Sequence, residues 1–467
     1  MALNAAVIFE VRNAADFAGA SDGNGGGFKA GASGIDYSHA SIEATGAPHV
    51  TIDGATITAT VNATTTKLDI AGYTTAAGDI GNLVNITGGS MTAGLYEIIG
   101  QTGGTQWTLD RACGTAAQTG TGAMGGCFAT PGKAAAVATV SGHKIWVRSG
   151  TTYTITTTTV GAAGPVYVNS VSVSMEGYQA TRGDYGTAPI LSAGAVSPAA
   201  SFYLFSAAGN YTITFVNLIA DGNHVVNGAN VAQGFSTQNA RHFVDTCEAR
   251  NCDGTASAIG FLSASGGING IRCKASVCSV GFSAGYWGWC VADTCTAGFT
   301  GNSENCLAKS CTTGFDLSGA LGYTATNCAA QGSSGSTGIG FSCAANQDRF
   351  VNCVATNYSG AGGIGFKTTG TSVASLYNCA GYNNATNVSG TFLRNDGFVS
   401  LSGDPFVSSS DYRNNATASA GAALRAAGIG QIIAYMGNAT IQDIGLGHAD
   451  PAGGGGIWLP QVEQVGL

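Results

Sequence analysis

The stretch that decides the fold is a phrase that reads Cys290-Val-Ala-Asp-Thr-Cys-Thr-Ala-Gly-Phe299 and again Cys306-Leu-Ala-Lys-Ser-Cys-Thr-Thr-Gly-Phe315. Looser copies precede and follow these two. Successive leading cysteines are 26, 17, 16, 22, 25 and 26 residues apart, in a segment rich in Gly, Ser, Thr and Asn. An irregular period of about 20 residues is typical of a solenoid, in which each repeat forms one coil.

Within each copy, the Cys-x-Ala triplet predicts a short strand with alternating side chains. In Cys247-Glu-Ala249 a period of two turns the first and third residues inward and the glutamate outward. The later glycine permits a corner, and the phenylalanine after it returns to the core. Parallel coils stack about 4.8 Å apart, so we expect two rows of like residues along the axis. These rows are Cys247, Cys273, Cys290, Cys306, Cys328, Cys353 and Cys379, and Phe261, Phe282, Phe299, Phe315, Phe341 and Phe366.

The fourteen cysteines admit three interpretations: a disulfide framework, zinc sites or free thiols. The Cys-x4-Cys pairs recur once per coil without nearby histidines, whereas a zinc site closes one tetrahedron. A long chain without a signal sequence is typical of a reducing compartment. We therefore predict free, buried, stacked thiols and no metal site, and the disulfide framework is the alternative.

The composition favours an all-β protein. Charged residues make up 9% of the 467 residues, against roughly 25% in ordinary globular proteins, and glycine contributes 73. Few long charged side chains means few good formers of solvent-exposed helices. Hydrophobic residues make up 44%, so the chain is not of the disordered polar class.

Charge and motifs exclude several function classes. The net charge is −8 and no run of Lys or Arg occurs, so the basic footprint of a nucleic-acid-binding protein is absent from the sequence. A continuous apolar window of about 18 residues is also missing, which argues against membrane insertion. The opening residues 1–12 do not resemble a secretory signal. Phosphate-loop, dinucleotide and nucleophile-elbow motifs are not found, and we predict no cofactor.

The chain divides into four parts by composition. Short alternating segments such as Thr56–Val61 and Gly94–Ile99, separated by Gly-rich turns, predict a small antiparallel barrel or sandwich before the repeats. The predicted parts are a Gly-rich entry or attachment segment over residues 1–48, an antiparallel β domain over 49–130, a right-handed parallel β-helix over 131–400, and a closing segment with an arm over 401–467.

Two stretches resemble known proteins. Lys133–Val140, a short helix before strands at 142–155, is similar to the capped entry of right-handed parallel β-helix proteins. The succession Gly403-Asp-Pro-Phe-Val407, Asp411-Tyr-Arg413, Ala422–Gly428 and Gln442–Gly445 resembles the closing motif of bacterial and phage β-helix proteins, although the usual Ser-Pro-Ala is missing. The resemblance covers roughly 130–448 and implies the fold. Lyases, tailspikes and virion proteins share that fold, so it specifies function poorly.

We searched the repeat for paired carboxylates, which glycosidases need about 5–10 Å apart. The acids that lie close in sequence are Asp245, Glu248 and Asp253, with Arg241, His242 and Arg250 nearby. Asp245 and Glu248 differ in strand parity, so the favoured interpretation is a set of surface charges. A lyase or glycosidase site is the alternative, and no catalytic residue is assigned.

Tryptophans supply the binding hypothesis. If Cys290 points inward, parity turns Trp287 and Trp289 outward on one face, where they form a platform for a sugar or a protein. The alternative is that they are covered or that the parity is reversed. Near the C-terminus, Trp458 follows four glycines and is interpreted as the apolar anchor of an arm that docks on a neighbouring subunit.

The preferred function is structural and non-enzymatic: a phage virion surface protein, either a tail fibre or spike or a capsid decoration protein. The Gly-rich opening, Phe9–Arg12 to Asp22–Phe28, is similar to that of phage structural proteins. Expected partners are other virion proteins and copies of the chain itself, with a trimer as one option, and a host surface glycan. The expected location is the virion, after synthesis in the host cytoplasm. The alternatives are a polysaccharide lyase or glycosidase on the same fold, and a carbohydrate-binding adhesin.

Overall fold

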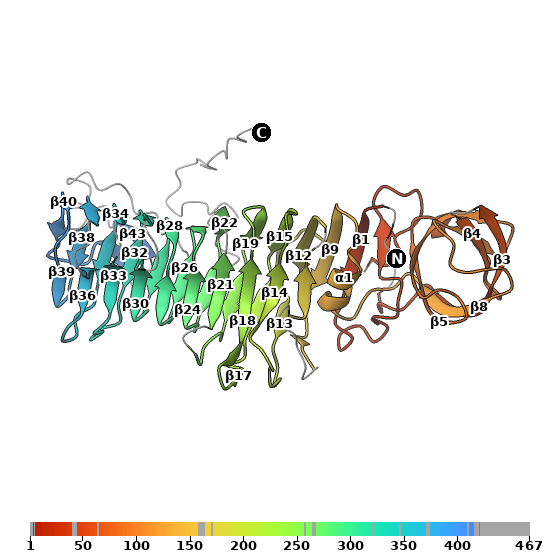
Figure 1. Cartoon of the computed structure of the whole chain (residues 1–467), viewed down its shortest axis with the longest axis horizontal. Helices are drawn as coiled ribbons and strands as arrows, with labels where there is room; N and C mark the ends of the chain where they lie inside the picture. Colours follow the sequence, from red (N-terminus) through yellow and green to blue (C-terminus); the bar gives the residue numbers. More distant parts are fainter. Residues whose placement is uncertain are drawn as a thin grey trace.

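The computed structural model is a long right-handed parallel β-helix with a small antiparallel barrel at one end (Figure 1). It describes residues 3, 5–39, 44–62, 65–156, 164–169, 171–255, 258–263, 268–318, 322–344, 347–369, 374–408, 411–414 and 420. Three sheets form the walls of the β-helix, and from β9 to β39 each coil contributes one strand to each sheet in turn. The predicted fold class, all-β with a β-helix and a smaller N-terminal antiparallel domain, is confirmed.

The first sheet runs in the order β2 (Gly27–Lys29), β1 (Val7–Val11), β9 (His143–Arg148), β12 (Val173–Tyr178), β15 (Ile213–Val216), β19 (His242–Asp245), β22 (Ile268–Ile271), β25 (Tyr286–Gly288), β28 (Asn302–Glu304), β31 (Thr324–Thr326), β34 (Arg349–Val351), β37 (Ser375–Tyr377) and β40 (Arg394–Asp396). The second sheet runs β10 (Tyr153–Thr154), β13 (Ile190–Ser192), β16 (Ile219–Asp221), β20 (Glu248–Arg250), β23 (Lys274–Ser276), β26 (Val291–Asp293), β29 (Leu307–Lys309), β32 (Ala329–Gln331), β35 (Val354–Thr356), β38 (Ala380–Tyr382) and β41 (Val399–Ser400).

The third sheet runs β11 (Val166–Val168), β14 (Phe202–Ala207), β18 (Asn230–Thr237), β21 (Ile259–Ser263), β24 (Val280–Ser283), β27 (Ala297–Phe299), β30 (Thr313–Asp316), β33 (Ile339–Cys343), β36 (Ile364–Thr368) and β39 (Thr386–Ser389), with β17 (Val226–Asn227) paired to β18. The closed barrel consists of β3 (Val50–Asn62), β4 (Thr65–Asp69), β7 (Gln106–Leu109), β6 (Gly94–Thr102), β5 (Leu83–Gly89) and β8 (Thr119–Met124), with the short 3-10 helix η1 (Ala77–Asp79). A separate hairpin pairs β42 (Phe406–Ser408) with β43 (Asp411–Asn414).

The entry segment is part of the β-helix. Strand β1 pairs in parallel with β9, so residues 7–11 belong to the first sheet although they precede the barrel in the chain. The short helix α1 (Pro131–Val137) begins where Thr130 accepts a hydrogen bond from the Lys133 N–H, with Pro131 in the first turn. It packs against β11 and β1, and so covers the end of the core. A cap is needed there because the first coil otherwise exposes apolar side chains.

Single residues with left-handed backbone make the corner between the first and second sheets. Asn305, Asn327, Asn352 and Asn378 have φ of 49–55°, and a cysteine follows each of them. Asparagine tolerates this conformation better than most residues. A corner of this kind interrupts the alternation of side chains, so inward and outward positions must be counted afresh after it.

The phenylalanines form a continuous stack inside the β-helix. Neighbouring rings from Phe261 to Phe366 are nearly parallel, with centroids 4.7–4.9 Å apart. The stack continues to Phe235 and Phe205 at 5.0 and 4.9 Å. The predicted row did not include Phe235 and Phe205, because no cysteine pair accompanies them. All the rings are buried, so their stacking contributes to the core of every coil they cross.

All fourteen cysteines are free and buried. At the first corner each thiol lies against two carbonyl oxygens. Cys306 Sγ, for example, donates toward Trp287 O at 3.2 Å and Glu304 O at 3.3 Å. Cysteine suits the position because it is small and apolar and still offers a weak donor to the corner carbonyl.

Thiol titration tests this arrangement. We expect no reaction of the native protein with a thiol reagent and fourteen reactive thiols after denaturation without reductant, because every thiol is buried and unpaired. The measurement is a colorimetric thiol assay with and without guanidinium. Fewer thiols in denaturant would contradict the assignment and restore the disulfide interpretation.

Two buried histidines make stability depend on pH. His143 Nδ1 accepts the Val7 N–H at 2.9 Å, and His242 Nδ1 accepts the Gln238 N–H at 3.1 Å. Burial lowers the pKa of both from the ordinary 6.5. The unfolded chain therefore binds protons that the folded chain does not, and stability falls as the pH drops below about 6.5. We expect a smaller fall between pH 7.5 and 5.5 for His143→Asn, measured by urea unfolding. An unchanged pH dependence would contradict the role of His143.

Among the described residues, no helix has the length and apolar character needed to span a bilayer.

Candidate functional site

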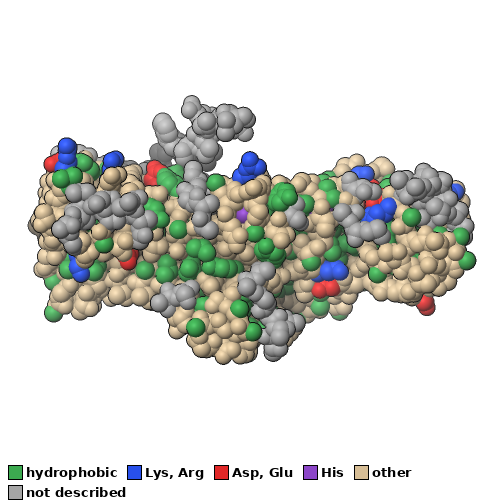
Figure 2. Space-filling model, in the orientation of Figure 1, with side chains coloured by type: hydrophobic (Ala, Val, Ile, Leu, Met, Phe, Trp, Pro, Cys, Tyr) green, Lys and Arg blue, Asp and Glu red, His purple; other side chains and the backbone are tan. Residues whose placement is uncertain are grey.

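Charged side chains gather on the outer face of the first sheet between β9 and β22. This concentration is notable in a chain with 9% charged residues, and Figure 2 shows how sparsely they occur over the visible face. Glu176 pairs with Val216 on the next strand, and Val216 pairs with Asp245 on the strand after it. The two acids therefore occupy the same outward column, two strand spacings or roughly 10 Å of backbone apart. Lys144 and Arg272 flank them.

Glu176 is nearly buried, with 6% exposure, and accepts hydrogen bonds from three sides. Lys144 Nζ lies 2.9 Å from Oε1, and Ser174 Oγ donates to the same oxygen at 2.6 Å. The Tyr185 hydroxyl donates to Oε2 at 2.9 Å. Three donors satisfy and orient this carboxylate, so its position is defined before any ligand binds.

Tyr185 belongs to the loop of residues 179–189 that joins β12 to β13. Other coils make the same corner with two residues, as Asn217 and Leu218 do. Tyr185 has a left-handed backbone (φ 43°) and is 37% exposed. Burial of the hydroxyl, its hydrogen bond to Glu176 and the charges of Glu176 and Asp245 raise its pKa to about 12. At neutral pH the phenol therefore stays protonated and can donate its hydrogen bond to Glu176.

Asp245 is held from the neighbouring coil. Arg272 Nε donates to Oδ1 at 2.8 Å, and a second guanidinium nitrogen contacts Oδ2. The Thr246 hydroxyl donates to Oδ1 at 2.8 Å. Both Thr246 and Arg272 stand at the left-handed corner with φ of 53° and 54°, where the coils from Asn305 onward have asparagine. A β-branched residue in this conformation is strained, and strain of this kind clusters at functional sites.

The parity argument about Asp245 and Glu248 was wrong. The corner at Thr246 restarts the count, so both side chains face outward, on different sheets. Glu248 lies 3.8 Å from Lys274 Nζ and accepts a hydrogen bond from the Ser276 hydroxyl. Asp253 contacts His224 at 2.7 Å beyond the next corner. The acids grouped by sequence are thus spread around the coil.

The prediction that Trp287 and Trp289 share an outer face was also wrong. Trp289 occupies a left-handed corner (φ 51°), which reverses the parity counted back from Cys290. Trp287 is fully buried against Phe261 and Phe282, and Trp289 alone is exposed, at 38%. The two-tryptophan platform, and the adhesin interpretation built on it, are therefore removed. Trp458 lies outside the described residues.

Sequence reasoning missed Lys144, Glu176 and Tyr185. They come from the entry coils, which carry no Cys and Gly-Phe phrase. A signal for Glu176 existed, because it stands at the end of the alternating segment Val171–Gly177. Trp146 lies close to Lys144, whose Nζ sits 4.4 Å from the indole centroid, and the indole itself is buried.

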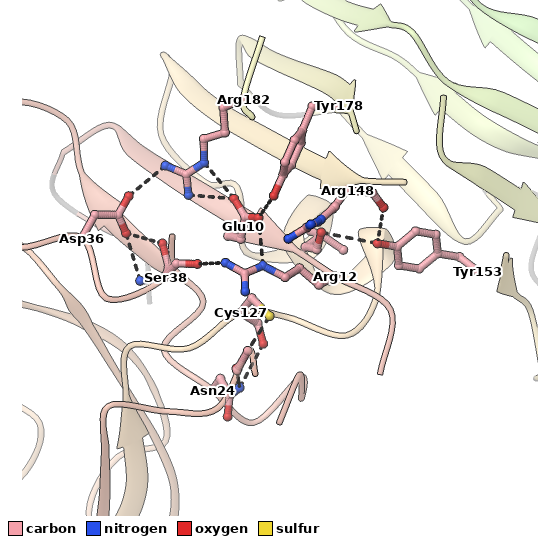
Figure 3. Close-up of polar contacts among 12 residues, drawn as sticks. Glu10, Arg12, Asn24, Asp36, Ser38, Cys127, Arg148, Tyr153, Tyr178 and Arg182 are labelled. Carbon is pink, nitrogen blue, oxygen red and sulfur yellow. Dashed lines mark hydrogen bonds and ion pairs between the residues drawn. The ribbon is translucent and has the colours of Figure 1, made fainter. Parts of the chain in front are cut away.

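A buried polar cluster adjoins the site at its N-terminal end (Figure 3). Glu10 on β1 accepts from Arg12 Nε at 3.1 Å and from the Tyr178 hydroxyl. Arg182, in the loop that carries Tyr185, contacts Glu10 at 2.7 Å and Asp36 at 2.8 Å. Within the described parts of the chain, no group of three or more His, Cys, Asp or Glu side chains is arranged to hold a metal ion.

No family model and no curated protein sequence matches the chain. Among solved structures, the chain is similar to the catalytic domain of a GH87 alpha-1,3-glucanase in complex with nigerose, with a TM-score of 0.26 and 12% identity. The match covers 74% of this chain and 90% of that one. A likeness at this level concerns the fold alone.

This finding contradicts the prediction of a non-enzymatic virion component. The matched structure is the catalytic domain of a glycosidase and not a virion protein. The likeness is too low to assign an activity to this chain, so any enzymatic function has to be argued from the side chains of the outer face.

Proposed function

We propose that the chain is a glycoside hydrolase that cleaves a polysaccharide along the outer face of the first sheet, with Glu176 and Asp245 as its two carboxyl groups. The observation that carries the proposal is their shared outward column, two strand spacings apart, with the Tyr185 hydroxyl hydrogen-bonded to Glu176. A flat open wall suits a long polymer, because a sugar chain can lie across successive coils.

The spacing favours an inverting reaction. Two strand spacings, roughly 10 Å of backbone, are closer to the about 6.5–9.5 Å between the carboxyl groups of inverting enzymes, which leaves room for a water molecule, than to the about 5–5.5 Å of retaining enzymes. One carboxyl group gives its proton to the glycosidic oxygen as the bond to the anomeric carbon breaks. The other takes a proton from the water whose oxygen attacks that carbon. Lys144, Tyr185 and Arg272 fix the two carboxyl groups and offer hydrogen bonds to sugar hydroxyls.

The experiment is a screen for reducing ends released from polysaccharides, with alpha-1,3-glucan, other α- and β-glucans and bacterial exopolysaccharides as substrates. We expect release by the native chain from at least one of them, and none by the Glu176→Gln, Asp245→Asn double variant. The matched control is Asp293→Asn, which removes an outward carboxylate on the second sheet. Equal activity of the double variant and the control would overturn the assignment of the pair.

A further inference from the structure

The loop that delivers Tyr185 is tied to the N-terminal strand by an ion pair. Arg182 Nε donates to Glu10 Oε2 at 2.8 Å, and another guanidinium nitrogen donates to Asp36 at 2.8 Å. Figure 3 shows the guanidinium lying between these two carboxylates. Arg182 and Tyr185 are three residues apart in one short loop. Through Arg182 the loop therefore contacts β1, and through Tyr185 it contacts Glu176 on β12.

The anchor is buried. The side chains of Glu10 and Arg12 have no exposed surface, and that of Arg182 is 13% exposed. Burial opposes the charge of Arg182, but Glu10 and Asp36 outweigh it and raise its pKa. A guanidinium fork between two carboxylates fixes direction as well as distance, which a single hydrogen bond does not.

The loop is also ordered internally. Asp184 accepts the backbone N–H groups of Gln179, Ala180 and Thr181 at 2.6–2.8 Å. Although burial works in the opposite direction, these bonds and that from Gly186 lower the pKa of Asp184 to about 2. The loop is therefore a preformed unit, and its placement depends on what holds it from outside.

We infer that Arg182 is a positioning residue for the carboxylate pair: it fixes the loop on Glu10 and Asp36 so that the Tyr185 hydroxyl meets Glu176. This inference rests on the proposed hydrolase function. It gives the segment of residues 7–36 a part in the site, and Glu10 stands on the same column of paired residues, since Glu10 pairs with Trp146 and Trp146 pairs with Glu176. Arg182 acts through Tyr185, so the effects of removing the two are linked.

The test is a double-mutant cycle of Arg182→Gln and Tyr185→Phe, with kcat and KM measured on the substrate found by the screen. We expect each single variant to lower kcat by roughly 10- to 100-fold with little change in KM, because a small misplacement of a fixed group has costs of this order. The double variant should be no worse than the poorer single one, since linked residues are not additive. Arg182→Lys should recover part of the loss.

The control is Arg250→Gln, which removes a guanidinium bound to Asp221 at 2.9 Å on the second sheet, and it should leave kcat unchanged. If the kcat losses of the two single variants multiply in the double variant, the inference is overturned. Hydrogen exchange of residues 179–189 gives a readout independent of catalysis: protection should fall in Arg182→Gln and return in Arg182→Lys. Unchanged protection in Arg182→Gln would contradict the anchoring role of Arg182, even if the native enzyme is active. If the native protein is inactive but protection falls in Arg182→Gln, the proposed function is contradicted and the anchoring role of Arg182 is not.

Discussion

Replacing Glu176 by Gln, or Asp245 by Asn, should lower kcat by about 100- to 10,000-fold, the usual contribution of a general acid or base. Both amides keep the shape of the side chain and remove its ability to exchange a proton. Glu176 is held by Lys144, Ser174 and Tyr185, so a substitution of equal size should leave the fold intact. The loss should therefore appear in kcat far more than in thermal stability.

Three measurements sharpen this expectation. Product stereochemistry, followed by proton NMR of the anomeric signal, should show inversion, because the pair is two strand spacings apart. A nitrophenyl glycoside, whose leaving group needs little protonation, should restore most of the rate for the variant that lacks the acid and not for the one that lacks the base. The control Asp293→Asn should match the native rate. Retention of configuration would contradict the assigned spacing.

The Phe299→Ala substitution should destabilise the β-helix by about 3–5 kcal/mol, the range for removing a buried phenylalanine. Phe299 is fully buried between Phe282 and Phe315, with ring centroids 4.7 and 4.8 Å away. Neighbouring rings cannot close the gap, because each is fixed at the spacing of its own coil. The cavity should therefore persist and interrupt the stack.

Urea unfolding followed by circular dichroism measures this loss as a shift in midpoint. The matched control is Phe243→Ala, which removes a half-buried ring from the outer face of β19 and should cost much less. The two variants remove the same atoms, so the difference between them isolates the stack. Equal shifts would show that the internal rings contribute nothing beyond ordinary surface packing.

The sequence was sufficient to predict the repeated coils of the β-helix, but not the residues that form the corners between its sheets. Repeated Cys and Gly-Phe spacing predicted the solenoid because stacked coils need like residues at like positions, and Phe261 to Phe366 do stack. The corner residues were not anticipated, because left-handed backbone is obvious at Asn305 or Asn327 and not at Thr246, Arg272 or Trp289. Counting parity through these positions produced the errors at Trp287 and Glu248.

The candidate site lay beyond sequence reasoning for a different reason. Glu176 and Asp245 meet only through the register of three parallel strands, which the irregular period cannot fix. Tyr185 comes from a loop that replaces a two-residue corner, and insertions of this kind carry no periodic signal. The acids that lie close together along the chain are Asp245, Glu248 and Asp253, and the structure spreads them over different faces.

The pairing of β1 with β9 has a consequence for the order of folding. The whole barrel is inserted between these two strands, so β1 leaves the ribosome long before its partner exists. The barrel closes on its own contacts from residue 50 to residue 124. Once closed, it shortens the effective chain between the two strands and lowers the entropy cost of joining them. We therefore expect the barrel to fold first during synthesis, and β1 to dock on β9 only after the barrel has closed.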